Sequence, residues 1–388
     1  MELKATFYRT MMILKPRNTS LFMYCAMLLM LFLFCLLIRM EVKSSLNGTS
    51  MLTQTHKNPP SRSSMIRDKT ELNRTAPKIH LECRNNGSLL QIPNGIPVLH
   101  QLFLQYKHCR TFRQLLSPKA CSNDLFLLMA IKSTAAQIDR RAALRSTWGR
   151  EGLFSGMRVQ LVFLLGRSMD RVRGHPLQPL LHYESRQFGD ILQWDFDDSF
   201  FNLTLKEVHF LNWFSRECRT AQFVLKGDDD VFVNTGNLLE YLWDKRPNDH
   251  LFVGDIISKA VPIRNIRRKY FIPMQMYPKK QYPPYAGGGG YLMSRRTVIG
   301  LDRAAQDTDL FPIDDVFVGM CLEKMNVTLV FHDGFRTFGF RQMVTPFNPC
   351  IYRGLMLIHK LSPAQMWAMW SLVNDPDLTC TRKFSINV

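Results

Sequence analysis

Residues 223–234 read FVLKGDDDVFVN, a short apolar run typical of a buried strand that leads directly into three adjacent carboxylates. Ligand sites of open α/β sheets lie at the carboxyl ends of strands, which is where this acidic run falls. Three adjacent like charges repel one another unless a cation lies among them, and carboxylate oxygens suit Mg²⁺ or Mn²⁺. The run therefore predicts a divalent metal site in which Asp228 and Asp230 bind one ion. An acidic turn without a metal is the alternative.

Outward from this stretch, short apolar runs alternate with segments of helical character. This alternation predicts an α/β fold with a mostly parallel sheet flanked by helices, and we expect residues 115–388 to form one domain. Thr204 followed by Glu207 predicts a capping-box start for one of the helices. The expected strands are 125–131, 159–165, a strand near 191, 223–225, 251–253, 327–331 and 355–358, and the expected helices are 140–148, 205–216, 238–243, helices near 295 and 315, and 363–373.

Near the N-terminus, residues 21–38 form an uninterrupted apolar run of 18 residues, which is just long enough to cross a bilayer core of about 30 Å. A cleavable signal peptide is the alternative, but its apolar core would be shorter, roughly 7 to 15 residues. Basic residues dominate the preceding tail, which predicts a cytosolic N-terminus and a luminal remainder. We therefore expect a cytoplasmic tail at 1–20, a transmembrane signal anchor at 21–38, a polar luminal stem at 39–114 and the folded domain at 115–388.

The composition gives a formal net charge of +18, which is typical of nucleic-acid binding. However, the basic residues are spread along the chain and no zinc-finger or basic-zipper pattern accompanies them, so we expect no nucleic-acid partner. Of nine cysteines, two lie in the apolar span, and the other seven predict disulfides in an oxidising compartment with one thiol free or paired between chains. Sequons for N-glycosylation, which agree with a luminal location, lie at Asn47, Asn73, Asn86, Asn202 and Asn326.

A second acidic pair, Asp314 and Asp315, opens the segment DDVFVGM at residues 314–320. The helix dipole favours carboxylates at a helix N-terminus, so helix capping is one interpretation. A carboxylate in this place could also take a proton from a hydroxyl group as a general base, and the two roles are compatible. Asp315 is the residue that we expect to act as this base.

Three further patterns are compatible with ligand binding. The tract AGGGGY at residues 286–291 follows several tyrosines; glycines allow a ligand to approach closely and tyrosine rings stack on sugars, although a flexible loop is the alternative. Arg141 and Arg145 lie four residues apart on one helical face, where they could meet a diphosphate or only a carboxylate elsewhere in the fold. His332 follows the expected strand 327–331, either as a metal ligand or as a structural histidine.

Taken in order, these motifs resemble the β-1,3-glycosyltransferases of glycosyltransferase family thirty-one over residues 125–359. The chain lacks the Gly-x-Ser-x-Gly and His-Glu-x-x-His motifs of hydrolases and zinc proteases. Six motifs in the family's order are not expected by chance. They are Arg-x-x-x-Arg-x-Thr-Trp at 141–148, Phe-x-x-Gly at 163–166, Glu184 with Asp-Ile-Leu at 190–192, Asp-x-Asp at 228–230, the Tyr-Pro to Gly-Tyr segment at 282–291 and the acidic catalytic motif at 314–319.

Several of these motifs are similar to the N-acetylglucosaminyl branch of the family. Galactosyl-transferring members commonly show Glu-Asp-Val where this chain has Asp-Asp-Val at 314–316. The segments 226–227, 286–290 and 334–338 are likewise similar to the N-acetylglucosaminyl branch. The resemblance implies metal-dependent transfer of GlcNAc, with inversion, from UDP-GlcNAc to the 3-hydroxyl of terminal galactose on glycoprotein or glycolipid glycans, as in poly-N-acetyllactosamine. A β-1,3-galactosyltransferase that uses UDP-Gal and a non-catalytic, membrane-anchored luminal lectin are the alternatives.

The resemblance also implies a GT-A-type, Rossmann-like mixed sheet, a Golgi membrane location with single-pass type II topology, and Mn²⁺ or Mg²⁺ as the cofactor. Roles follow for individual residues. Asp315 is the catalytic base. Donor binding falls to Arg141, Arg145, Lys226, Asp228 and Asp229, acceptor binding to Tyr285, Gly289, Tyr291 and Asp314, and metal binding to Asp228, Asp230 and His332.

Overall fold

The structure, a computed structural model, describes residues 83, 95–168, 177–339 and 347–380 of the 388-residue chain. These residues belong to one compact unit that runs from Ile79 to Val388. The predicted membrane span at 21–38 lies outside the described residues. Among the helices that the structure describes, none is long enough and apolar enough to cross a membrane.

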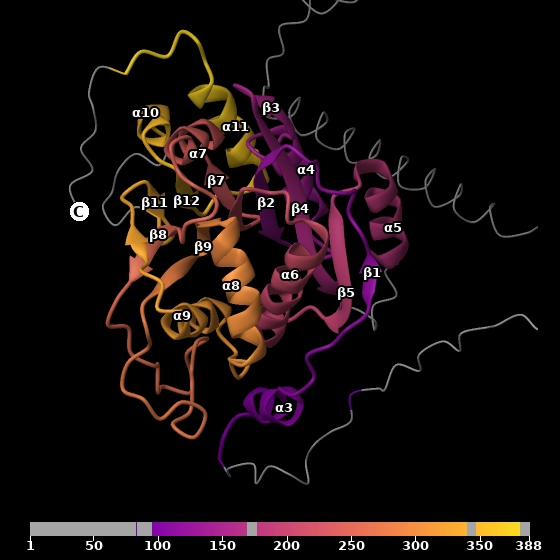
Figure 1. The fold of residues 1–388 in the computed structure, drawn as a ribbon, viewed down its shortest axis with the longest axis vertical. Coiled ribbons are helices and arrows are strands. Elements are labelled where there is room, and N and C mark those ends of the chain that lie inside the picture. The colour runs from indigo at the N-terminus through magenta and orange to yellow at the C-terminus, as the bar shows by residue number, and fades with distance from the viewer. Residues whose placement is uncertain (1–82, 84–94, 169–176, 340–346, 381–388) are drawn as a thin grey trace, which may run out of the picture. The chain divides into compact units, whose positions relative to one another are not determined.

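A mixed sheet lies at the centre of this unit, as the alternation of apolar runs predicted (Figure 1). In spatial order its described strands are β1 (Gln114–Leu116), β5 (Ile191–Asp197), β4 (Met157–Arg167), β2 (Leu125–Lys132), β6 (Phe223–Asp228), β9 (Tyr285–Ser294), β8 (Phe252–Ile257) and β10 (Val330–Phe331), with β3 (Gly152–Phe154) paired to β4. Strands β5, β4, β2 and β6 run parallel to one another. Strand β9 is antiparallel to both of its neighbours, and beyond it β10 is parallel to β8. The edge strand β1 is antiparallel to β5, so the sheet is mixed and its parallel half is formed by β5, β4, β2 and β6.

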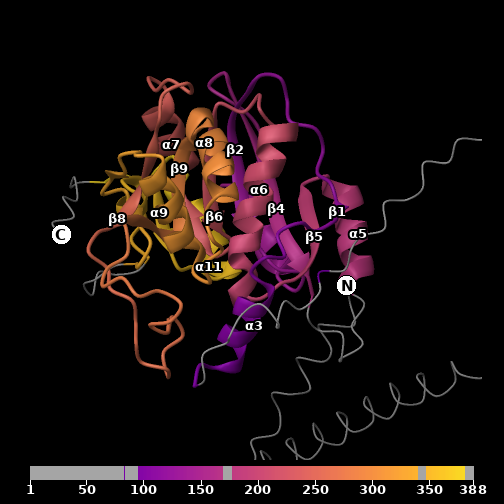
Figure 2. The same ribbon diagram turned by 60° about the horizontal axis from the view of Figure 1, so that its bottom comes forward.

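Two hydrophobic clusters lie on the two faces of the sheet, because successive side chains of a strand point to opposite faces. In β2, Leu127 and Met129 belong to one cluster, and Leu128 and Ala130 belong to the other. Burial on both faces explains why the parallel strands read as continuous apolar runs. The first cluster includes residues of α4 (Ile138–Ser146), α7 (Thr235–Leu242) and α11 (Pro363–Val373), and the second includes residues of α6 (Leu203–Glu217), α8 (Arg295–Gln306) and α9 (Asp314–Lys324). Figures 1 and 2 show these helices packed around the sheet.

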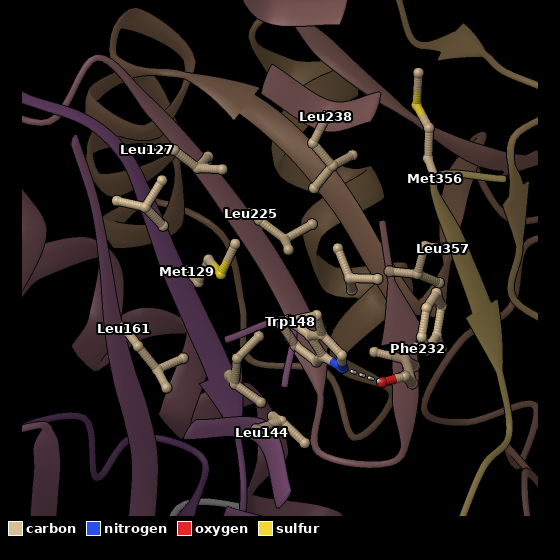
Figure 3. Packing of buried hydrophobic residues seen from close by; sticks show 14 of the residues in the cluster. Leu127, Met129, Leu144, Trp148, Leu161, Leu225, Phe232, Leu238, Met356 and Leu357 are labelled. Carbon is tan, nitrogen blue, oxygen red and sulfur yellow. Dashed lines mark hydrogen bonds between the residues drawn. The ribbon is translucent and has the colours of Figure 1, made fainter. Parts of the chain in front are cut away.

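A second, smaller sheet brings the C-terminal part of the chain next to the acidic run. It consists of β11 (Phe335–Arg336), β12 (Leu357–His359) and β7 (Val231–Val233). Strand β12 is antiparallel to β7 and pairs His359 with Val231, so the end of β12 lies beside Asp230. Trp148 packs under this sheet, and its indole N–H donates to the Val231 carbonyl at 3.0 Å (Figure 3). The other described helices are α3 (Val98–Tyr106), α5 (Leu177–Phe188), α10 (Pro349–Arg353) and the 3-10 turn Phe200–Asn202.

Most of the expected elements are present, and three features differ. The predicted capping box of α6 is wrong: no side chain caps the helix, the Thr204 hydroxyl donates to a backbone carbonyl before α9, and Glu207 faces Lys226. The glycine tract, for which a flexible loop was the alternative, lies within strand β9. The expected strand 327–331 is reduced to Val330–Phe331.

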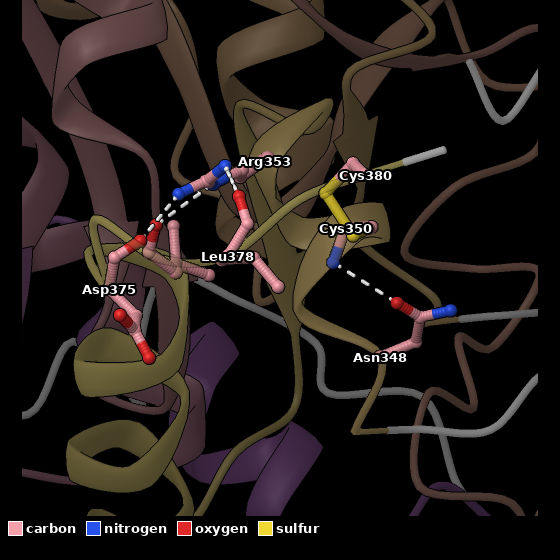
Figure 4. Close-up of a disulfide and its surroundings, with 7 residues drawn as sticks. Asn348, Cys350, Arg353, Asp375, Leu378 and Cys380 are labelled. Atoms are coloured by element: carbon pink, nitrogen blue, oxygen red, sulfur yellow. Dashed lines mark hydrogen bonds between the residues drawn. A yellow bond between two sulfur atoms is a disulfide. The ribbon is translucent and has the colours of Figure 1, made fainter. Parts of the chain in front are cut away.

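Three disulfides and one buried thiol account for the seven cysteines outside the apolar span, so the expected odd thiol is confirmed. Beside one disulfide, Arg353 donates to the carbonyls of Val373, Asp375 and Leu378 at 2.9 to 3.0 Å (Figure 4). These hydrogen bonds hold the segment after α11 against α10. The pairs are Cys83–Cys109, Cys121–Cys218 and Cys350–Cys380, and Cys321 is unpaired.

Candidate active site

A cavity of about 810 Å³ lies at the carboxyl ends of the parallel strands β2 and β6, where the position of the acidic run predicted a ligand site. Its walls come from parts of the chain that are far apart in sequence: the ends of β2, β6 and β12, the start of β9 and the first turn of α9. Positive and negative side chains alternate around it. The charged or titratable lining residues are Lys132, Arg140, Lys206, Asp228, Asp229, Asp230, Lys269, Tyr270, Tyr282, Tyr285, Asp314, Asp315, His359 and Lys360.

The first two carboxylates of the acidic run have different partners. Asp228 forms an ion pair with Lys132 at 3.2 Å. Asp229 is buried, and its two oxygens accept hydrogen bonds from the Ser133 hydroxyl and from Arg140, each at 2.7 Å. Burial raises the pKa of Asp229 above its ordinary value, although both partners stabilise the charged form. The oxygens of Asp229 are therefore occupied by the protein itself.

The third carboxylate, Asp230, is surrounded by cationic or potentially cationic groups. One oxygen faces the His359 ring nitrogen at 3.4 Å, and the other lies 3.2 Å from Arg140 and 3.6 Å from Lys360. Burial raises the pKa of Asp230, but these neighbours outweigh it and hold that pKa below its ordinary value. Asp230 is therefore ionised at neutral pH, with an imidazole nitrogen beside it.

The second acidic pair lies in the first turn of α9, where the helix dipole favours carboxylates. Asp314 is buried and accepts from Lys132 at 2.7 Å; burial opposes ionisation, but Lys132 holds the pKa of Asp314 below its ordinary value. Asp315 forms no hydrogen bond or ion pair with any residue that the structure describes. Burial and the charge of Asp314 raise the pKa of Asp315 well above its ordinary value. Asp315 is thus an unpaired carboxylate in the cavity wall.

The glycines of β9 allow its backbone to pass close to the protein's own side chains. At Gly288, a Cβ atom would stand 2.6 Å from a carboxylate oxygen of Asp315. At Gly287, it would stand 2.1 Å from the Thr337 hydroxyl. Both distances are shorter than atoms can approach, so any larger residue would displace these side chains. The glycines therefore accommodate Asp315 and Thr337, which shapes the wall around Asp315, and the close approach of a ligand stays a prediction.

The structure brings most of the predicted acceptor-binding residues to the cavity. Tyr285, Gly289 and Asp314 line it, and burial raises the pKa of the Tyr285 hydroxyl. Tyr291 does not line it, because its ring is buried and stacks on Phe252 with the centroids 4.8 Å apart. Tyr291 instead belongs to the second hydrophobic cluster, which includes residues of α6, α8 and α9.

Three predicted donor-binding cations lie behind the cavity wall. Arg141 and Arg145 both contact Glu184 on α5, at 2.8 and 2.7 Å. Lys226 pairs with Glu207 on α6 at 2.8 Å, and burial nevertheless lowers the pKa of Lys226. None of the three lines the cavity. The helical spacing correctly placed the two arginines on one face of α4, but that face packs against a buried carboxylate.

His332, the predicted metal ligand, also lies outside the set of cavity-lining residues. Its Nδ1 accepts from the Gly334 backbone N–H at 3.0 Å, and its ring meets the Tyr241 ring edge-on. His359 occupies the cavity wall instead. Both histidines follow late strands, but only β12 runs beside β7 and the acidic run.

Residues 139–332 match a family model described as Galactosyltransferase. The chain belongs to this family. It is 54% identical over 305 residues to the human protein "N-acetyllactosaminide beta-1,3-N-acetylglucosaminyltransferase 4", covering 78% of this chain and 79% of that one. It is 51% identical over 291 residues to the rat protein "UDP-GlcNAc:betaGal beta-1,3-N-acetylglucosaminyltransferase 7", covering 73% of each. The resemblance that the ordered motifs carried is therefore confirmed.

Among the titratable cavity residues that sequence reasoning missed in this galactosyltransferase-family chain, four lie beside the acidic residues: Lys132, Arg140, His359 and Lys360. Each follows or neighbours a feature that was recognised. Lys132 comes directly after the strand 125–131, and His359 directly after the strand 355–358. Ligand sites of α/β sheets lie at the carboxyl ends of strands, and this rule, which selected the acidic run, would also have selected Lys132 and His359. Arg140 was not predicted, because the i, i+4 spacing selected the neighbouring Arg141 together with Arg145.

The donor atoms around Asp230 fit a divalent cation in part. A carboxylate oxygen and an imidazole nitrogen, on Asp230 and His359, face each other, and both are ligand types that Mn²⁺ accepts. The carboxylate of Asp228 is turned to Lys132. Among the described residues, the one set of three candidate ligand atoms within 4.8 Å of one another includes the disulfide-bonded Cys83 and Cys109, and it is therefore not a metal site. A divalent ion at the acidic run would need ligand atoms from its substrate.

Aromatic side chains form another part of the cavity wall. Phe200, Tyr270 and Phe338 line it together with Lys269. The Lys269 ammonium lies 4.9 Å from the Phe200 ring centroid and 5.1 Å from that of Tyr270. Aromatic faces of this kind pack against the apolar faces of sugar rings.

Proposed function

We propose that this chain transfers GlcNAc from UDP-GlcNAc to the 3-hydroxyl of terminal galactose, with inversion, on glycoprotein or glycolipid glycans. The observation that carries the proposal is the position of Asp315, an unpaired carboxylate in the same cavity as the acidic run. Two curated relatives named as β-1,3-N-acetylglucosaminyltransferases support the choice of sugar. The chain is thus a UDP-sugar-dependent β-1,3-glycosyltransferase.

Asp315 acts as the general base in this proposal. Its carboxylate takes the proton of the galactose 3-hydroxyl while that oxygen attacks the anomeric carbon of GlcNAc, and the bond from that carbon to the diphosphate breaks as UDP leaves. Attack opposite the leaving group inverts the anomeric configuration. The raised pKa of Asp315 makes it a stronger base than an ordinary aspartate. The absence of a competing ion pair leaves its oxygens available to the acceptor.

The acidic run holds the donor end of the site. Asp230 and His359, together with Asp228, would bind Mn²⁺ or Mg²⁺, and the ion would offset negative charge on the departing diphosphate. This assignment replaces His332 with His359 because only His359 lies beside Asp230. The chain's own cations also face this region, and Lys132 forms ion pairs with both Asp228 and Asp314. Without these ion pairs, the five carboxylates that line the cavity would repel each other and the donor more strongly.

The acceptor end is formed by the aromatic wall and the start of β9. Phe200, Tyr270, Tyr285 and Phe338 would pack against the galactose and the sugar that precedes it. Gly288 allows Asp315 to approach this wall. We further propose that the mixed sheet is of the GT-A type and that the enzyme is a single-pass type II protein of the Golgi membrane. Three disulfides and the luminal sequons support the oxidising compartment.

A donor and acceptor matrix tests this function. The full chain, purified in detergent, is incubated with Mn²⁺ and UDP-GlcNAc, UDP-Gal or UDP-GalNAc, against a galactose-terminated and a GlcNAc-terminated acceptor, and products are identified by mass spectrometry and linkage analysis. We expect GlcNAc on the 3-hydroxyl of galactose, and no product with EDTA. Galactose added to GlcNAc would keep the mechanism but replace the donor, and glycan binding without any transfer would favour a lectin.

A further inference from the structure

Behind the cavity, a series of buried polar contacts leads from α5 to the acidic run. Arg141 on α4 is fully buried, which is costly for a charge unless its donors all have acceptors. Its guanidinium donates twice to Glu184, at 2.8 Å each, and once to the Ser133 hydroxyl at 3.0 Å. Two further donations reach the carbonyls of Thr134 and Ala135. All five N–H groups of this arginine are therefore used.

Ser133, at the end of β2, continues the series into the cavity wall. Its hydroxyl accepts from Arg141 and donates to Asp229 at 2.7 Å. A hydroxyl has one hydrogen, so the donation to Asp229 is directed by the acceptance from Arg141. The second oxygen of Asp229 accepts from Arg140, which lines the cavity. We call Glu184, Arg141, Ser133 and Asp229 the buried relay.

Two consecutive arginines of α4 thus have opposite surroundings. Arg140 faces the cavity and lies 3.2 Å from Asp230, whereas Arg141 is buried behind it. Ser133 and Asp229 connect the two guanidinium groups, so a shift of one is transmitted to the other. A guanidinium presents several N–H donors in a fixed plane, which suits the oxygens of a diphosphate. Its orientation therefore affects how well a diphosphate is bound.

We propose that the buried relay positions Arg140 for the diphosphate of the donor. Asp229 and Arg141 are then positioning residues: Asp229 orients a protein cation, and Arg141 holds Ser133 in the orientation that Asp229 requires. This inference rests on the proposed function, because it takes the donor to be a nucleoside diphosphate sugar. It changes the role of the middle residue of the acidic run, for which the sequence predicted direct donor binding.

The test removes the two hydrogen bonds that the Ser133 hydroxyl makes in the relay, with Arg141 and with Asp229, without removing a charge. Ser133→Ala in the full chain is compared with Ser146→Ala, whose exposed hydroxyl on α4 donates to the Ala142 carbonyl at 2.9 Å. Calorimetry with UDP and Mn²⁺ gives Kd, and initial rates give KM for donor and acceptor separately. We expect Ser133→Ala to raise the Kd of UDP and the donor KM about 10-fold. The acceptor KM should stay unchanged, and Ser146→Ala should behave as the wild type.

A purely structural network gives a different pattern. It would lower the melting temperature and the fraction of active protein, and so the apparent kcat, while Kd and KM of the remaining folded enzyme stayed at wild-type values. This result with Ser133→Ala would overturn the proposal. A wild-type chain that does not bind UDP would instead contradict the proposed function. The use of UDP alone makes the test independent of which sugar the donor carries.

A double-mutant cycle tests whether Arg141 acts through Ser133. Arg141→Lys keeps the charge but loses the planar fork, so we expect it to raise the Kd of UDP by at least as much as Ser133→Ala. If both act on Asp229 through one relay, the double variant is less than additive. Full additivity would show that the two residues act separately and would overturn the proposal. If Arg141→Lys does not fold, the Ser133→Ala comparison decides alone.

Discussion

Asp230 and Asp315 line the same cavity, and yet their surroundings move their pKa values in opposite directions. His359, Arg140 and Lys360 hold the pKa of Asp230 down, whereas burial and Asp314 raise that of Asp315. The cationic neighbours keep one carboxylate ionised and suited to a metal or a diphosphate. The unpaired carboxylate is a stronger base. The difference teaches that partner side chains, rather than the residue type, assign the two roles in this site.

Replacement of the unpaired carboxylate should have the largest effect. Asp315→Asn keeps the shape but removes the base, so we expect kcat to fall roughly 10³-fold with UDP binding retained. Initial rates and calorimetry on the full chain provide the measurement. Asp244→Asn, at an exposed aspartate, is the matched control. Retention of transfer activity within a few-fold of the wild type would assign the base elsewhere.

The paired carboxylate should instead show its effect through the metal. Asp230→Asn removes the charge that His359 faces, so we expect Mn²⁺ to bind less tightly. The Mn²⁺ concentration that gives the half-maximal rate should rise at least about 100-fold. His359→Ala should shift the same quantity in the same direction, whereas His332→Ala should leave it unchanged. A large shift for His332→Ala with none for His359→Ala would restore the assignment that the sequence predicted.

Gly288→Ala tests the difference between Asp230 and Asp315, because it should displace the carboxylate of Asp315 only. The added Cβ would stand 2.6 Å from an oxygen of Asp315, so the base must shift while Asp230 keeps its partners. We expect kcat to fall roughly 10- to 100-fold because displacement of a reacting group by about 1 Å has effects of this size. Gly236→Ala on α7, where the nearest atom is 3.4 Å away, should leave the rate unchanged. Equal rates for both variants would show that Asp315 tolerates the shift.

The smallest predicted effect is on stability. A pKa raised in the folded state means that wild-type stability falls as the pH rises from the ordinary value of 3.8 through the folded pKa of Asp315. Asp315→Asn removes this loss, so we expect its melting temperature at pH 7 to exceed that of the wild type by a few degrees. The difference should disappear below pH 3.8, because Asp315 is then protonated in both states. Thermal unfolding of both proteins across this pH range measures it, and a less stable variant at pH 7 would contradict the raised pKa.

The elements of the parallel half were the most predictable part of the fold. Strands β2, β4 and β6 are covered on both faces, so each contains an apolar run that the sequence shows, although β4 and β6 extend beyond the predicted ranges 159–165 and 223–225. Strand β9 was not predicted, because four glycines carry no strand signal by themselves. Its conformation is set by pairing with β6 and β8 and by close packing against Asp315 and Thr337.

The candidate site shows the same division. The acidic run and Asp315 could be selected because they lie at the end of a strand and at the start of a helix, and these are local features. The partners could not be selected in this way. Arg140 and Arg141 are neighbours on α4, and the local sequence does not show which of them is buried. The packing of α5 decides this, because its Glu184 pairs with Arg141.

By itself, the sequence determined the α/β fold with its mixed sheet, the acidic run, the choice of Asp315 as the candidate base, and the family, because apolar periodicity and short motifs are properties of contiguous residues. The tertiary structure alone decided that His359 rather than His332 reaches Asp230, and that Arg140 rather than Arg141 reaches the cavity. Each of these choices depends on contacts between segments far apart in the chain, such as the pairing of β12 with β7. Such contacts are fixed by the burial of whole elements against one another, which no local pattern of residues records.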